Sequence, residues 1–346
     1  MPRDSTNVTM RDTSDVIREF EAALADAGLI LHGPPVMDGM LRRVPVIGDR
    51  PGRRSGAYLG HLDGLPAGHI TNWKTGLQTT WKSLHPTQGT GQGTRSSPLW
   101  RANIRNRAEV KRAAIARRQA RTARYAARLW ENAASAPYDH PYLVRKGVAA
   151  HGIRISKTGC LLIPAHDIDG RLWSLTRIKP DGMKLFLRGG RVEGCHYMIG
   201  ALGPQKPILI AEGFATAATL HEITGLPAVA AMMSGNLSAV ARATRCRYQR
   251  ARIIIAGDND HHLQVQNPPL LNVGKVKAEE AAGACEGIAL VPIFEPEDEG
   301  TDWNDLAARQ GAEALRAQLA VFPELAPYLT PGASSCSPFR GTARPP

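Results

Sequence analysis

The carboxyl-terminal half of the chain alternates short apolar runs with segments of mixed polarity. Four apolar runs predict strands and three intervening segments predict helices, in the order 207–211, 214–223, 227–233, 237–247, 251–256, 275–286 and 288–294. Strands that alternate with helices of about ten to fifteen residues predict a parallel sheet with crossover helices. We therefore expect an α/β fold in this half, with helices flanking the sheet.

The amino-terminal part shows a different pattern. Residues 14–30 predict a helix that Ser14 can cap, because Ile17, Phe20 and Leu24 recur on one helical face. Residues 44–82 alternate around a predicted Asp63–Gly64 turn, which is typical of a small β-rich unit. The segment 85–98 is rich in Gly, Thr, Gln and Ser and predicts a linker.

Residues 100–135 are the most basic stretch, with alanine between the charges, and predict a long helix. Only Glu109 and Glu131 oppose ten basic residues there: Arg101, Arg105, Arg107, Lys111, Arg112, Arg117, Arg118, Arg121, Arg124 and Arg128. Such a helix is either a solvated surface or a contact for nucleic-acid phosphates, which release counterions when cations neutralise them. Among the tryptophans, Trp73 and Trp81 are candidate base-stacking surfaces.

These patterns predict five regions along the chain. They are a small α+β region with its linker, a basic helical segment, a β-rich region, the α/β domain, and a Pro-, Ser- and Gly-rich tail that is expected to be disordered. Their boundaries fall at 1–98, 99–136, 137–205, 206–325 and 326–346.

The distribution of charge sharpens this division. The 346 residues carry a net charge of +12, yet residues 206–330 hold 10 basic and 15 acidic residues, whereas residues 1–205 hold 31 basic and 16 acidic ones. A basic front half predicts a polyanionic partner, and an acidic back half predicts bound cations. No apolar run approaches the ~20 residues of a membrane span, and the polar first twelve residues give no secretory signal, so we expect a cytoplasmic location without membrane contact.

Acidic residues follow the predicted parallel strands. Glu212 comes directly after the first strand, and Asp258 and Asp260 come after the third. Functional residues of open parallel sheets lie past the carboxyl ends of strands, and residues two apart in extended chain project the same way. Clustered carboxylates repel one another unless a hard cation neutralises them, which favours Mg²⁺ or Mn²⁺. The five cysteines form no CxxC pair, so no zinc site is expected.

These motifs resemble a known family. ILIAEGFATAATL, the later IIIAGDND and then GTDWNDLA look like the Toprim domain of topoisomerases and bacterial-type primases, in which one Glu precedes Asp-x-Asp by about 45 residues. Upstream, HPYLVRKGV, SLTRIKPDGMKLFLRGGRVEG and AYLGHLDGLPAGHITNWKTG look like the amino-terminal regions of plasmid and phage primases. The resemblance implies a Toprim-like parallel sheet flanked by helices, preceded by a basic α+β region.

The resemblance assigns roles at the first two motifs. Glu212 matches the acid/base glutamate, and Asp258 and Asp260 match the metal-binding pair, so these three are the expected catalytic residues and metal ligands. A structural interpretation stays open for each: Glu212 could interact with a helix dipole, and the aspartates could stabilise a turn.

Two further pairs are assigned in the same way. Asp302 and Asp305 match a later acidic motif that assists metal or nucleotide binding, and Arg177 and Lys184 match basic positions that would face template or nucleotide. Asp302 and Asp305 could instead cap the helix at 303–310, and Arg177 and Lys184 could be solvated strand residues. The basic helix would add Arg117, Arg118, Arg121 and Arg124 to the nucleic-acid contacts.

The resemblance implies a DNA primase, a nucleotidyltransferase that uses NTPs to make short RNA primers on single-stranded DNA during plasmid or phage replication or transfer. The chain departs from many such primases: it has no cysteine zinc module and no GxxxxGK[ST], so no helicase motor is encoded and a separate replicative helicase is the candidate partner. Two alternatives stay open, a Toprim nuclease and a non-catalytic accessory protein that binds single-stranded DNA.

Overall fold

A computed structural model describes residues 13–62, 65–83, 98–203, 206–265 and 270–329, without the side chains of 98–108. The predicted Asp63–Gly64 turn, nearly all of the predicted linker and most of the predicted disordered tail lie outside these ranges. The chain divides into two compact units, residues 1–110 with 266–271 and residues 111–265 with 272–346, which are treated separately below.

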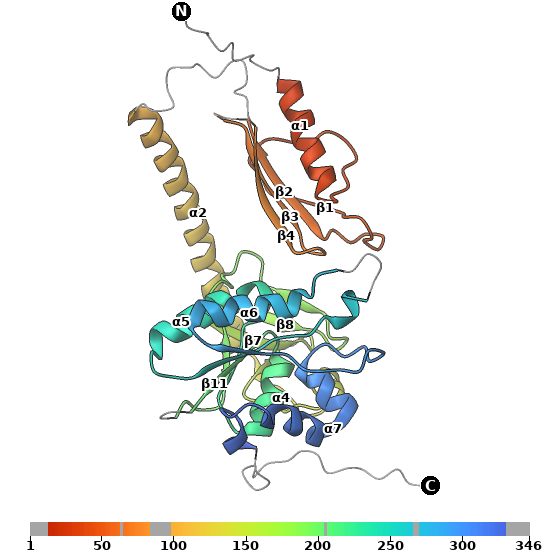
Figure 1. Ribbon diagram of the computed structural model, residues 1–346. Helices are drawn as coiled ribbons and strands as arrows, with labels where there is room; N and C mark the ends of the chain where they lie inside the picture. Colours follow the sequence, from red (N-terminus) through yellow and green to blue (C-terminus); the bar gives the residue numbers. More distant parts are fainter. Residues whose placement is uncertain (1–12, 63–64, 84–97, 204–205, 266–269, 330–346) are drawn as a thin grey trace, which may run out of the picture. The chain divides into compact units, whose positions relative to one another are not determined.

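The first unit is a helix on an antiparallel sheet (Figure 1). Helix α1 (Thr13–Asp26) buries one stripe, including Phe20 and Leu24, against Tyr58 and Ile70 of the sheet. The strands lie in the order β1 (Arg42–Val44), β2 (Gly56–His61), β3 (Ala67–Asn72) and β4 (Leu77–Lys82).

The two tryptophans proposed for base stacking both have intramolecular partners in this unit. The ring of Trp81 lies 4.8 Å from that of Phe20 and packs on the core. The guanidinium of Arg43 lies 4.0 Å over the ring of Trp73, which is 40% exposed. Trp81 is therefore a core residue, and Trp73 keeps only part of its surface free.

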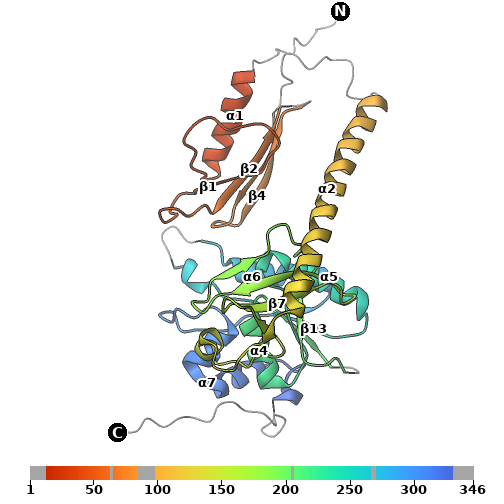
Figure 2. The same cartoon turned by 180° about the vertical axis from the view of Figure 1, so that it is seen from behind.

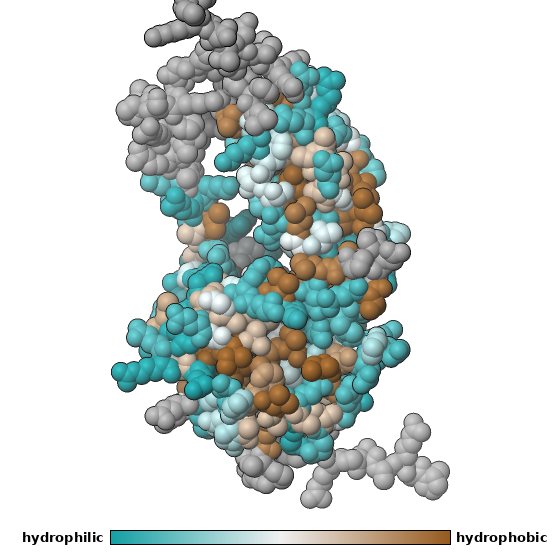
Figure 3. Space-filling view, in the orientation of Figure 1, coloured by the Kyte–Doolittle hydropathy of each residue, from teal (hydrophilic) through white to brown (hydrophobic). Residues whose placement is uncertain are grey.

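The predicted basic helix is present as α2 (Pro98–Glu131), and the boundary between the two units falls inside it. Its second half belongs to the second unit and lies against the sheet that contains β7 (Figure 2). Ala126 is fully buried there and packs with Leu162, Leu175 and Leu187. Arg117, Arg118, Arg121 and Arg124 are exposed, which produces the hydrophilic surface along the described side chains of α2 in Figure 3.

The sheet beneath α2 is antiparallel throughout. Its strands follow chain order, and the short helix α3 (Pro141–Lys146) lies between the first two. The strands are β5 (Ala134–Ser135), β6 (Arg154–Ile155), β7 (Leu161–His166), β8 (Leu172–Ile178) and β9 (Lys184–Phe186).

The remaining strands form the predicted parallel sheet, in the order β10-β12-β11-β13-β14. β11 (Ile208–Ala211), β12 (Ala228–Ala230), β13 (Ile253–Ala256) and β14 (Ile288–Leu290) are parallel, and β10 (Tyr197–Ile199) adds an antiparallel edge. Each parallel strand is an uninterrupted or nearly uninterrupted apolar run because helices cover both faces.

The helices lie on opposite faces of this sheet. α4 (Phe214–Thr224) and α7 (Trp303–Ala320) share one apolar cluster, and α5 (Leu237–Arg247) and α6 (Val273–Cys285) share another, as Figure 1 shows. The helix predicted at 303–310 continues to Ala320, because the chain resumes its helical course after Gly311, whose φ of 87° breaks it locally. Single 3₁₀ turns lie at Ser234–Asn236, His261–Leu263 and Ala326–Tyr328. No helix in the described ranges is both long and apolar enough to span a membrane.

Candidate active site

The predicted acidic residues meet at one edge of the parallel sheet. β11 lies between β12 and β13, and the two crossover helices α4 and α5 cover opposite faces, so the strand order reverses at β11. Glu212 follows β11, and Asp258 follows β13, its immediate neighbour in the sheet. A crevice at the carboxyl edge of such a switch point is where open α/β sheets bind ligands.

The loop after β13 is fixed by the start of α6. The Asn272 side chain caps this helix by accepting from Lys275 N at 3.1 Å, and it also accepts from Asp260 N at 3.0 Å. A Cβ at Gly274 would lie 2.5 Å from the carbonyl oxygen of Asp258, so only glycine permits this approach of α6. The Asp258 backbone is thereby held against the helix.

Asp258 and Asp260 have different local surroundings. Asp260 leaves the extended conformation, with φ −77° and ψ 45°, and its Oδ2 accepts the Gly274 N–H at 2.9 Å. It does not line the pocket that Asp258 lines. The strand-like geometry expected for this pair is therefore not kept at Asp260, whose role as a metal ligand stays a prediction. Asp260 still acts on the pocket through its charge, as its effect on Glu212 and Asp258 shows below.

A third carboxylate comes from the start of α7. Asp302 is the N-cap of this helix and accepts from Asp305 N at 2.8 Å, and the same side chain lines the pocket beside Glu212 and Asp258. The capping role and the pocket role, which the sequence left as alternatives, therefore coexist. By contrast, the N-cap of α4 is Gly213, so Glu212 is not the N-cap of the helix that follows it; its carboxylate instead accepts the Ser234 N–H at the start of the 3₁₀ turn before α5.

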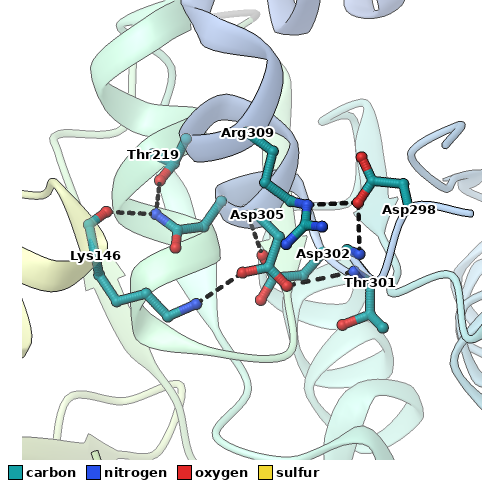
Figure 4. Close-up of polar contacts among 9 residues, drawn as sticks. Lys146, Thr219, Asp298, Thr301, Asp302, Asp305 and Arg309 are labelled. Atoms are coloured by element: carbon teal, nitrogen blue, oxygen red, sulfur yellow. Dashed lines mark hydrogen bonds and ion pairs between the residues drawn. The ribbon is translucent and has the colours of Figure 1, made fainter. Parts of the chain in front are cut away.

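Polar contacts lock the start of α7 onto α3 and α4 (Figure 4). Asp305 pairs with Lys146 Nζ at 2.9 Å and accepts from Thr301 N at 3.3 Å. Asn304 donates to Lys146 O at 2.7 Å and to Thr219 Oγ1 at 2.8 Å. Asp305 therefore has both oxygens engaged and does not line the pocket, and its role as a metal ligand stays a prediction.

The pocket measures about 290 Å³ and is lined by both cationic side chains and carboxylates. Its charged and hydroxyl-bearing lining includes Tyr142, Arg145, Lys146, Asp181, Lys184, Glu212, Thr216, Asp258 and Asp302. Lysine and arginine beside a recessed carboxylate cluster suit a ligand that carries phosphate groups and a metal ion.

The carboxylates raise one another's pKa. Burial raises the pKa of Glu212, and the charges of Asp260 and Asp302 raise it further, against the lowering effects of Lys184 and of a hydrogen bond from Ser234 N–H. Burial, Glu212, Asp302 and Asp260 together raise the pKa of Asp258 well above its usual value. Burial and Asp305 raise the pKa of Asp302, against Lys146. The site therefore holds more negative charge than its lysines neutralise.

The donor set fits a hard divalent cation. Oδ1 of Asp258 is buried without a hydrogen-bond partner, which leaves a free oxygen in the pocket. Within the described ranges no three His, Cys, Asp or Glu side chains converge on a single metal position. Mg²⁺ does not require such convergence, because it commonly binds through one or two carboxylates and keeps water or substrate oxygens as its other ligands.

The strand register separates the two predicted basic residues. Lys184 pairs with Ile178 and Leu185 pairs with Arg177, so Lys184 and Arg177 lie on opposite faces of the sheet. Lys184 lines the pocket, whereas Arg177 shares the face of Leu162, its partner on β7, which packs under α2. The structure thus brings together Glu212, Asp258, Asp302 and Lys184, and places Arg177 elsewhere.

Five of these lining residues were missed by sequence reasoning: Asp181, Thr216 and three residues of α3. Tyr142, Arg145 and Lys146 come from α3, about 70 residues before Glu212 in the chain. Burial raises the pKa of the Tyr142 hydroxyl to about 12, so it stays protonated and able to donate. The available signal was the HPYLVRKGV segment, in which Pro141 opens a helix, Gly147 ends it with φ 61°, and basic residues occupy its last turn.

A parallel sheet with carboxylates beyond two neighbouring strands defines the class of α/β proteins that bind ligands at a topological switch point. Residues 207–313 match the Toprim domain family. The chain is 38% identical over 290 residues, 80% of its length, to a DNA primase TraC of Escherichia coli, and 39% identical over 304 residues, 84% of its length, to another. The chain therefore contains a Toprim domain and is similar to DNA primase TraC over most of its own length. It spans 26% and 20% of the lengths of these two relatives.

Solved primase structures are also similar. The primase fragment of the bacteriophage T7 primase-helicase protein aligns with a TM-score of 0.40 and 16% identity, over 51% of this chain and 72% of that one. The DnaG primase catalytic domain bound to ssDNA aligns with a TM-score of 0.40 and 15% identity, over 60% of this chain and 80% of that one.

Proposed function

We propose that this chain is a DNA primase-like nucleotidyltransferase that makes short RNA primers on single-stranded DNA. The observation that carries the proposal is the pocket that is lined by three carboxylates and three cationic side chains, namely Glu212, Asp258, Asp302, Lys184, Lys146 and Arg145. The identity to DNA primase TraC over most of this chain supports it. Template DNA and NTPs are the proposed substrates, and a separate replicative helicase is a proposed partner in plasmid or phage replication or transfer in the cytoplasm.

The carboxylates would hold Mg²⁺ or Mn²⁺. Asp258 offers its free Oδ1, and Glu212 and Asp302 line the same pocket. Asp260 would add negative charge near these side chains. When bound, such an ion neutralises charge on the transferred phosphoryl group and lowers the pKa of the attacking hydroxyl.

The remaining side chains would bind and orient the substrates. Lys184, Lys146 and Arg145 would bind the phosphates of an incoming NTP, because they line the same pocket as the carboxylates. Glu212 has a raised pKa and lies beside Lys184, which suits it to accept the proton of the 3′-hydroxyl that attacks the α-phosphate. Arg117, Arg118, Arg121 and Arg124 would bind the template backbone.

Primer synthesis on a circular single-stranded template tests this function. The chain is incubated with labelled NTPs and Mg²⁺, and a reaction with EDTA serves as the control. We expect labelled oligoribonucleotides only where Mg²⁺ is present. Cleaved template without oligoribonucleotides would show a Toprim nuclease instead, and a mobility shift without either product would show a non-catalytic DNA-binding protein.

A further inference from the structure

Trp173 occupies an irregular position at the start of β8. The register with β7 shifts there, since Ser174 pairs with Ala165 and Leu172 pairs with His166, which leaves Trp173 as an extra residue. A bulge of this kind re-aims a side chain away from the regular alternation of a strand. Trp173 is partly exposed, whereas Ser174 and Leu175 on its carboxyl side are fully buried.

Two arginines flank the indole ring of Trp173. The guanidinium of Arg171 lies 4.1 Å from the ring centroid and that of Arg191 lies 4.9 Å from it. The indole N–H donates to Asp167 Oδ2 at 2.6 Å, and Arg191 Nη1 lies 3.9 Å from the same oxygen. We call Arg171, Trp173 and Arg191 the arginine–tryptophan stack. Its members are held in place before any ligand arrives, and Arg171 is exposed.

A glycine pair joins the stack to α2. Arg191 ends the sequence Arg188-Gly-Gly-Arg, in which a Cβ at Gly189 would lie 2.9 Å from the side chain of Arg118, and one at Gly190 would lie 2.3 Å from Ser174 Oγ. Thr122 Oγ1 also donates to Arg188 O at 3.3 Å. The turn at Gly189 and Gly190 therefore packs between α2 and β8. It connects the basic side chains of α2 with the arginine–tryptophan stack.

The other end of the same loop reaches the carboxylate pocket. Asn236 accepts from Gly194 N at 2.8 Å and donates to Cys195 O at 2.9 Å, which ties the loop after Arg191 to the turn at Ser234–Asn236. The Ser234 N–H in that turn hydrogen-bonds the Glu212 carboxylate. The loop that carries Arg191 is thus connected to the candidate active site by a short run of hydrogen bonds.

The charges of this surface favour a polyanion. Arg118, Arg171, Arg188 and Arg191 converge on the two turns, and within the described ranges only Asp167 pairs with any of them. Asp169 and Glu193 lie in the same turns, but no described guanidinium pairs with their carboxylates. Basic side chains interleaved with an aromatic ring are typical of surfaces that bind single strands through phosphates and bases.

We propose that the arginine–tryptophan stack binds single-stranded DNA and guides the template from α2 towards the carboxylate pocket. This inference rests on the proposed function. Arg171 and Arg191 bind backbone phosphates, Trp173 contacts a base, and Asp167 is a positioning residue for the indole ring.

Binding measurements on substituted proteins test the stack. Arg171→Gln removes one exposed charge, Trp173→Phe keeps a ring, and Trp173→Ala removes it. The matched control is Arg250→Gln, which removes one exposed charge just before β13, at the opposite edge of the sheet from the carboxylates. Affinity for an oligo(dT) is measured over a range of salt concentrations, and thermal midpoints show that each protein is folded.

We expect Arg171→Gln to weaken binding and to reduce the slope of log affinity against log salt by about 0.7, the value for one phosphate contact on a single strand. Trp173→Ala should weaken binding by roughly 5- to 140-fold, the range for one stacked base, and Trp173→Phe should lose much less. Arg250→Gln should bind as the wild type does. Equal affinities and slopes for Arg171→Gln and Arg250→Gln would overturn the proposal.

Photocrosslinking locates the contact independently of folding effects. Iodouracil-substituted DNA is crosslinked to the wild-type protein, and the tryptic peptide Leu172–Arg177 should carry the adduct on Trp173. Absence of this adduct, or stronger competition by an RNA oligonucleotide of the same sequence than by DNA, would contradict a template site. Primer synthesis is measured in parallel: binding and crosslinking without primers would refute only the proposed activity, and primers with unchanged Arg171→Gln binding would refute only the stack.

Discussion

At the scale of single residues, Asp258 bears an electrostatic penalty in the pocket. Its side chain is surrounded by three other carboxylates, and one of its oxygens has no partner. A buried ionised group without compensation destabilises the folded state unless a cation arrives or a proton binds. The same feature that prepares the pocket for a metal ion therefore lowers the stability of the metal-free protein.

Asp258→Asn should therefore stabilise the protein in EDTA, by about 1–3 kcal/mol at neutral pH. Because the folded-state pKa of Asp258 is raised above its unfolded value of about 3.8, wild type and variant should be equally stable below that pH. The difference should grow as the pH rises and the wild-type carboxyl must lose its proton. Chemical denaturation from pH 4 to pH 8 measures it, and a difference that shrinks with rising pH would contradict the account.

Lys184 offers a second test at this scale. It lowers the pKa of both Glu212 and Asp258, so Lys184→Gln should raise both further and shift the acidic limb of the pH–rate profile to higher pH. Loss of one charged contact should also reduce primer synthesis at pH 7 by about tenfold or more. Lys157→Gln, in the exposed turn before β7, is the matched control. An unshifted limb would show that Lys184 does not interact with the carboxylates in solution.

The sequence predicted the residues that follow strands better than those that reach the pocket from elsewhere. Glu212 and Asp258 could be placed because the carboxyl ends of neighbouring parallel strands must meet. Arg145 and Lys146 could not, because no local pattern shows that α3 packs against α7. Arg177 and Lys184 were predicted to face template or nucleotide, and the sequence did not show that they lie on opposite faces, because the side of a sheet depends on the register of a hairpin.

At the scale of elements, the start of α7 combines a cap with a ligand-binding group, and the two roles of Asp302 can be separated. Ser is about as good an N-cap as Asp, so Asp302→Ser should keep the cap and remove the pocket charge. We expect Asp302→Ser to be at least as stable as wild type, and Asp302→Ala to be about 1 kcal/mol less stable than Asp302→Ser. Thermal denaturation compares them, and equal stability of the two variants would show that the cap contributes nothing.

Helix α2 is the element for which the sequence left function open. Replacing Arg117, Arg118, Arg121 and Arg124 by Gln should weaken single-strand binding, and each lost phosphate contact should remove about 0.7 from the log–log salt slope. Helicity should persist because Gln is a good helix former. The control replaces Arg242, Arg247 and Arg250, which are exposed on and after α5. A slope unchanged by the α2 substitutions would show that the helix is only a solvated surface.

The elements themselves were largely predictable because their signals are local. The alternation of apolar runs with helical segments predicted the parallel sheet, and the segment rich in alanine and arginine predicted α2. Two features needed tertiary information. α7 continues beyond Gly311 because Leu315 and Leu319 are buried in the core on its far side, and β10 joins the parallel sheet although it follows the antiparallel one in sequence.

At the scale of the whole molecule, the proposed catalytic residues and the proposed DNA-binding residues lie in different parts of the chain. The acidic carboxyl-terminal half supplies the pocket on a parallel sheet, and the basic residues before it supply surfaces for a polyanion. We therefore expect that a substitution in the pocket can abolish catalysis without weakening DNA binding, and that substitutions in the basic surfaces can weaken DNA binding without changing the pocket.

Primer synthesis by Asp258→Asn, compared with wild type on the same template and with saturating Mg²⁺, tests this claim most directly. The variant should bind single-stranded DNA as tightly as wild type and make primers at least about 100-fold more slowly, because it loses charge only where the metal and the reacting phosphate are placed. Primer synthesis by the variant at a rate near that of wild type would contradict the assignment of the carboxylate pocket as the catalytic centre.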